Sequence, residues 1–80
     1  MPYIEESSKQ YLNTYGMPRT TGELNYKITM LLKEYLHGYG KSYSTINDIL
    51  GALEWAKLEF VRRIVNPYED IKKAENGDVY

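Results

Sequence analysis

The stretch from Ser44 to Asn66 reads STINDILGALEWAKLEFVRRIVN and decides the fold of this chain. It contains no proline and a single glycine, Gly51, so little inside it interrupts a helix. Its apolar residues return at intervals of three and four, which places them on one face of a helix about 34 Å long. The residues of this face are Ile46, Ile49, Leu50, Leu53, Ala56, Phe60, Val61 and Ile64.

A second apolar stripe lies further round the same predicted helix. A helix on the surface of a monomer needs only one such stripe, so two stripes indicate burial on two sides. We therefore expect a homo-oligomer, a dimer or larger, with the second stripe as its interface. The stripe consists of Gly51, Trp55, Leu58 and Val65.

The segment from Leu24 to His37 is the second strongly periodic part of the chain, and it predicts another helix. Just before it, Thr20 and Glu23 have the spacing of a capping box, in which Thr20 is the N-cap. Gly38 stands where a glycine typically follows the last residue of a helix.

A short connection joins the two long helices, and either Ser42 or Ser44 is the expected N-cap of the second one. Short helix–helix connections place the two helices side by side and antiparallel. The sequence therefore predicts a helical hairpin, in which residues 21–37 pack against residues 44–66.

Shorter helices are expected at both ends of the hairpin. Residues 5–14 predict a first short helix. Asn66 and Pro67 are expected to end the long helix, because a proline disfavours the helical conformation of the residue before it. They then begin a last short helix as its N-cap and first residue, and this helix ends near Asn76. The predicted fold is all-α, with one helical domain over residues 1–80.

Composition excludes several classes of protein. The 80 residues include no cysteine and one histidine, which leaves neither disulfides nor the ligands of a structural zinc site. The net charge of −1 argues against a binder of nucleic acid. There is no transmembrane run, no signal peptide and no catalytic constellation. We expect a soluble cytoplasmic protein that is not an enzyme and that uses no cofactor or metal.

Three cations near the end of the long helix are the candidate ligand-binding group. Lys57 projects from the middle of the apolar face, where it either pairs with Glu54 or Glu34 or faces an anionic ligand. Arg62 and Arg63 either favour the negative end of the helix dipole or bind phosphate. Their side chains are expected to diverge by about 100°, so symmetry in an oligomer would have to bring several together.

Tyrosine is unusually frequent, with nine residues against one Phe and one Trp. Tyrosines at helical spacing commonly belong to a core or an interface, but their rings also stack on bases. Tyr68 follows directly after Pro67, near the basic group, and Tyr26 lies on a second line of the helix 24–37. Both are candidate ligand-binding residues beside Lys57, Arg62 and Arg63.

Several segments together resemble a family of very short proteins from bacteriophages, prophages and bacterial genomes. They are MPYI at 1–4, GELNY at 22–26, INDILGALE at 46–54, KLEFVRR at 57–63, PYED at 67–70 and ENGDVY at 75–80. The resemblance covers nearly the whole chain and carries no active site to transfer. Family members often have a longer, more charged first helix, so residues 5–20 depart from the pattern.

By its size, its hairpin and its tyrosines and basic residues, the chain is also similar to phage anti-defence sponges built on a helical hairpin. This looser likeness implies a homo-oligomer in the host bacterial cytoplasm that sequesters a cyclic nucleotide or an ADP-ribose-type immune signal between its subunits. The alternative is a small interaction module that binds and inhibits a host or phage protein.

Overall fold

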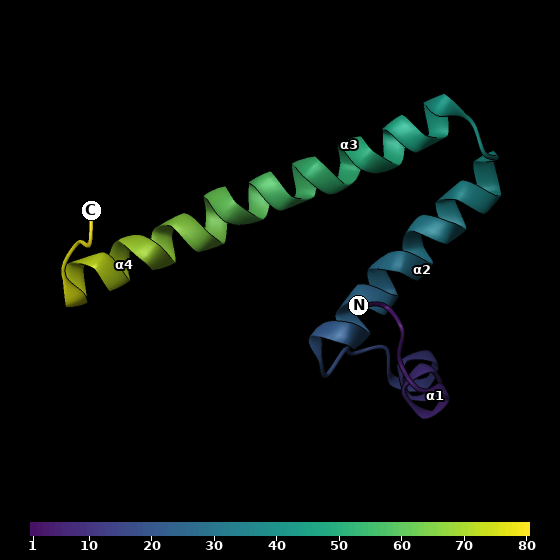
Figure 1. The fold of residues 1–80 in the computed structure, drawn as a ribbon, viewed down its shortest axis with the longest axis horizontal. Coiled ribbons are helices and arrows are strands. Elements are labelled where there is room, and N and C mark those ends of the chain that lie inside the picture. Colours follow the sequence, from purple (N-terminus) through teal and green to yellow (C-terminus); the bar gives the residue numbers. More distant parts are fainter. The chain divides into compact units, whose positions relative to one another are not determined.

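The computed structural model describes residues 1–80 and is all-helical. Its elements are α1 (Glu6–Tyr15), α2 (Thr21–Tyr39), α3 (Tyr43–Phe60), a π-helical segment η1 (Val61–Val65) and α4 (Asn66–Asn76). The chain divides into two units, residues 1–46 and 47–80, each of which is described by itself. Figure 1 shows α3, η1 and α4 as one uninterrupted helical ribbon. The predicted all-α class is confirmed, while the hairpin pairing stays a prediction.

In the first unit, α1 packs against the beginning of α2. Gly16 ends α1 in the left-handed region, with φ of 80°, which an L side chain rarely adopts. Leu12 is the one large apolar residue that is buried, with 5% of its surface exposed. The extended residues before α1 approach α2 at Gly22, where a Cβ would lie 3.3 Å from the carbonyl oxygen of Met1. The buried apolar core of this unit therefore consists of a single leucine side chain.

The N-cap of α2 is the predicted one. The Glu23 backbone N–H donates to Thr20 Oγ1 at 3.1 Å. The reciprocal bond of a full capping box is absent, because the Glu23 carboxylate accepts from Arg19 instead. The C-terminus differs from the prediction: α2 runs through Gly38 to Tyr39. Gly40 ends it at φ of 87°, and its N–H donates to the Leu36 carbonyl.

Ser42 is the N-cap of α3, as one of the two predicted alternatives. Its Oγ accepts from the Thr45 backbone N–H at 3.1 Å, and Thr45 is buried. Only Gly40, Lys41 and Ser42 separate α2 from α3.

The predicted break at Asn66 and Pro67 is wrong. Val65 and Asn66 both have helical backbone angles, and Asn66 makes no side-chain cap. A proline inside a helix lacks the N–H for the preceding turn and crowds the carbonyl it would have bonded. Here the preceding turn is wider, since the Asn66 N–H donates to the Val61 carbonyl, five residues back. This wider turn lets the helix pass Pro67 without ending.

Candidate functional site

The Glu59 carboxylate gathers two arginines at the junction of α3 and η1. Arg62 Nη2 donates to both carboxylate oxygens at 3.0 Å, and Arg63 Nε donates to Oε2 at 2.8 Å. These bonds hold the pKa of Glu59 below its usual range, Arg63 being the larger cause and Arg62 the next. All three side chains are exposed. We call these residues the arginine pair and its carboxylate.

This convergence corrects the prediction that the two arginines diverge. Their Cα–Cβ bonds do leave the helix at different angles, but each side chain is long enough to reach a carboxylate three or four residues earlier. Glu59 stands at i−3 from Arg62 and at i−4 from Arg63. Consecutive arginines can therefore meet at one acceptor on their own helix.

The other predicted ligand-binding residues of this unit lie along the same ribbon. Lys57 Nζ is 3.9 Å from Glu54 Oε1, which is one of the two acidic partners expected for it, and both side chains are exposed. The Tyr68 ring lies 5.5 Å from Lys72 Nζ, and Tyr68 is 56% exposed. Between residues 47 and 80, seven acidic side chains outnumber five basic ones. Each of the three cations also lies beside an acidic partner on its own helix.

The predicted interface stripe is exposed at two of its positions and half-buried at Gly51 and Val65. Trp55 is 68% exposed and Leu58 is 43% exposed. A Cβ built on Gly51 would meet no atom within 4 Å, so the helix backbone is uncovered there. Val65 is the last residue of η1, where the wider turn changes its angle around the axis relative to the other three. The stripe as an interface stays a prediction.

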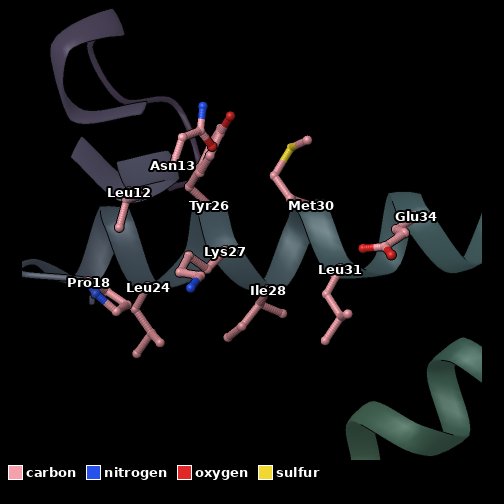
Figure 2. A pocket seen from close by; sticks show the side chains of 10 residues that line it. All are labelled: Leu12, Asn13, Pro18, Leu24, Tyr26, Lys27, Ile28, Met30, Leu31 and Glu34. Carbon is pink, nitrogen blue, oxygen red and sulfur yellow. The ribbon is translucent and has the colours of Figure 1, made fainter. Parts of the chain in front are cut away.

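Tyr26 belongs to the first unit, at a groove of about 550 Å³ beside α2. The groove is lined mainly by apolar side chains, with Leu12 from α1 and Leu24, Ile28 and Leu31 from α2. Figure 2 shows Leu24, Ile28 and Leu31 on one side of α2, while Tyr26 and Met30 point to the other. The Lys9 ammonium lies 5.9 Å from the Tyr26 ring.

A charged cluster that the sequence did not reveal joins α1 to α2. Arg19 bonds both oxygens of the Glu23 carboxylate, at 3.2 and 3.1 Å, and its guanidinium carbon lies 3.5 Å from the centre of the Tyr11 ring. Glu23 is buried, with 4% of its surface exposed. The Arg19 side chain, then its backbone N–H, lowers the pKa of Glu23, and Glu23 raises that of Arg19. The capping-box signal marked Glu23, but nothing in the local pattern marked Tyr11 as a partner.

Both charged clusters are held together by ion pairs and hydrogen bonds. No group of three or more His, Asp or Glu side chains is placed to hold a metal ion. No helix is both long and apolar enough to cross a membrane. Of the predicted ligand-binding residues, Lys57, Arg62, Arg63 and Tyr68 are exposed, and Tyr26 is half-buried.

A family model described as Domain of unknown function (DUF6899) matches residues 1–79. The chain belongs to this family. No curated protein and no solved structure matches it. The family assignment covers all five helical segments, so the arginine pair and the Arg19–Glu23 cluster both lie within the DUF6899 domain.

Proposed function

We propose that this protein is a non-enzymatic interaction module that works as an assembly of copies of itself. One observation carries the proposal: most large apolar residues of the long helices are exposed, and Leu12 is the one large apolar side chain that is buried. Contiguous exposed apolar surface marks a place where another molecule binds. A chain of 80 residues also commonly gains stability by oligomerisation.

In this proposal α2 and α3 form an antiparallel hairpin, which covers one apolar face of α3. The other face, with Gly51, Trp55, Leu58 and Val65, is left for a second copy. The outer surface is rich in tyrosine: Tyr15, Tyr39 and Tyr43 are each more than 70% exposed. Tyrosine offers a rigid, amphipathic contact area of the kind that protein interfaces use. The partner is a host or phage protein that the module inhibits, in the bacterial cytoplasm.

A second candidate is an oligomeric anti-defence sponge that sequesters a cyclic nucleotide or an ADP-ribose derivative. The arginine pair favours it, because the two guanidinium groups already converge on one anionic group within 3.0 Å. A phosphate offers the same kind of oxygen acceptors and would replace Glu59. Lys57 would add charge, and the rings of Tyr68 or Tyr26 of another subunit would stack on the base.

Thermal-shift measurements against cyclic dinucleotides, cyclic trinucleotides and ADP-ribose derivatives separate the two candidates. A ligand at a hundred times its Kd stabilises the folded protein by about 2.7 kcal/mol. The sponge predicts such a shift, and Arg62→Ala or Arg63→Ala should weaken binding by about 1.5–3 kcal/mol each. Glu59→Gln should strengthen it, because the carboxylate no longer competes for the arginines.

Lys41→Ala is the matched control, since Lys41 is exposed in the connection before α3 and far along the chain from the arginine pair. If no nucleotide shifts the melting temperature while the protein remains oligomeric, the interaction module stands and the sponge is rejected. If a nucleotide binds, and Glu59→Gln and Arg62→Ala change its affinity in opposite directions, the sponge replaces the module.

A further inference from the structure

The exposed apolar face of α3 has the spacing of a coiled-coil seam. Its residues stand at intervals of four and three, which is the heptad pattern that keeps one face of a helix toward a partner helix. All of its apolar members are at least 36% exposed. The only polar residue among them is Lys57. The seam of α3 consists of Ile46, Leu50, Leu53, Lys57 and Phe60.

One face of α2 has the same spacing in the same exposed state. Figure 2 shows three of its members, Leu24, Ile28 and Leu31, on one side of the helix. Tyr35 continues the pattern one step further along α2. The exposed fractions of these four residues run from 40% to 65%, so neither α1 nor α2 itself covers them. These four residues are the seam of α2.

The residue intervals of the α2 seam equal those of the α3 seam when α3 is followed from its C-terminal to its N-terminal end. Along α2 the steps from Leu24 to Tyr35 are four, three and four residues, and along α3 the steps from Lys57 back to Ile46 are also four, three and four. In an antiparallel pair, facing residues have numbers that add to a constant. Here the constant is 81 in every layer, as for residues 28 and 53.

We propose that the seams of α2 and α3 pack against each other within one chain, in this one antiparallel register. The layers are Tyr35 with Ile46, Leu31 with Leu50, Ile28 with Leu53, and Leu24 with Lys57. This rests on the hairpin of the proposed function and specifies its partner face and register. The midpoint of the register falls between residues 40 and 41, inside the three-residue connection from Gly40 to Ser42. A connection of that length suits an antiparallel pair of helices in the same chain.

The register assigns a role to Lys57. A polar residue at one core position of a coiled coil specifies register at a cost in stability, because other registers bury its charge. In this register Lys57 faces Leu24, which is only three residues from the first residue of α2. The Lys57 ammonium therefore reaches past the N-terminus of α2 to solvent and to Glu54. The first residue of α2, Thr21, then faces Phe60, the last residue of α3. The cover provided by α2 thus ends where η1 begins and leaves the arginine pair open.

Cysteine crosslinking tests the register directly, because the natural chain has no cysteine. The double variant Ile28→Cys with Leu53→Cys places both thiols in one layer. The matched control, Ile28→Cys with Leu50→Cys, uses a layer of the same seam shifted by one turn. Oxidation of dilute protein should form the in-register disulfide about tenfold faster. The shift in the control adds an axial offset of about 4.5 Å, which takes the two Cα atoms beyond the roughly 7 Å that a disulfide can bridge. The product should migrate as a monomer on a non-reducing gel.

Equal or faster oxidation of the control overturns the register, and a disulfide-linked dimer overturns pairing within one chain. A second measurement uses the same cysteine pairs in a Lys57→Leu background. Without the lysine, other registers become accessible, so the preference for the in-register pair should shrink while the melting temperature rises. An unchanged preference shows that Lys57 does not specify the register. Light scattering on the cysteine-free protein reports assembly separately, so this inference and the proposed oligomer can fail independently.

Discussion

Arg19 holds the Glu23 carboxylate through three hydrogen bonds, two from its side chain and one from its backbone N–H, at 3.0 to 3.2 Å. The Glu23 side chain is 5% exposed, while that of Arg19 is 48% exposed and covers it. This pair joins the loop before α2 to its first turn, and Arg19 also stacks on Tyr11 of α1. The charge on Glu23 therefore contributes to holding α1 against α2.

Acid should weaken the first unit by neutralising Glu23. The folded-state pKa of Glu23 is lowered from its ordinary value of 4.5, so its contribution to stability is complete at neutral pH. That contribution is lost as the pH falls below about 4 and through the folded pKa. Urea unfolding of the parent and of Glu23→Gln should therefore differ at pH 7, and the difference should shrink as the pH falls below about 4. Glu34→Gln, on an exposed side chain of the same helix, is the matched control. Parallel curves for parent and Glu23→Gln would contradict this role.

Removing the N-cap of α2 should cost about 1 kcal/mol of unfolding free energy, because the Glu23 N–H loses its acceptor at Thr20. The change is Thr20→Ala, measured by urea unfolding at fixed protein concentration. Thr20→Ser keeps an oxygen in place and should retain most of the stability. Thr14→Ala, on an exposed side chain near the end of α1, is the control. A cap of no importance would make Thr20→Ala and Thr14→Ala equal.

Truncating Leu12 should destabilise the packing of α1 against α2. Leu12→Ala removes the one buried large apolar side chain, for which losses of about 2–5 kcal/mol are typical. We expect a value near the lower end, since the site is shallow and can collapse. Hydrogen exchange of the α1 amides should accelerate. Val79→Ala, at 91% exposure, should change neither quantity. Unaltered exchange in α1 would mean that Leu12 does not hold this helix.

Replacing Pro67 should allow η1 to close into an ordinary α-helix. Pro67→Ala restores an N–H and removes the ring that the wider turn accommodates. The helix content should therefore rise, and the free energy of unfolding should increase by as much as about 3 kcal/mol. Circular dichroism and the exchange rates of residues 61–67 report the change. Pro18→Ala, in the connection between α1 and α2, is the comparison. A loss of helix content in Pro67→Ala would show that the proline favours this segment rather than interrupts it.

The sequence predicted those features that depend on neighbouring residues in a helix. Thr20 and Ser42 cap helices because a hydroxyl needs only a backbone N–H three residues on. The prediction that α2 ends before Gly38 was wrong, because a second glycine, Gly40, follows two residues later. The helix continues through Gly38 and ends at Gly40. Asn66 is helical although it precedes Pro67, because the π-helical turn before it is wider than an α-helical turn. No local sequence pattern predicts such a turn.

The candidate site was predictable in composition and less so in geometry. Arg62 and Arg63 were identified as the basic group, but their meeting at Glu59 depends on the reach of flexible side chains, not on the angle at which they leave the helix. The Arg19–Tyr11 contact joins residues of different elements, so its signal lies in tertiary packing. The proposed pairing of the two seams, by contrast, rests on the four-three-four spacing of their residues, which can be read from the sequence. The structure leaves the residues of both seams exposed.

The account depends on one claim, that the exposed apolar stripe with Trp55 and Leu58 is covered when copies of the chain assemble. Light scattering coupled to size-exclusion chromatography at micromolar concentration tests it most directly. The predicted result is a molar mass at a whole multiple, two or higher, of the 9.4 kDa chain. Trp55→Ala with Leu58→Ala should then lower that mass, while Val79→Ala should keep it. A stable species of 9.4 kDa for the parent protein would contradict the account.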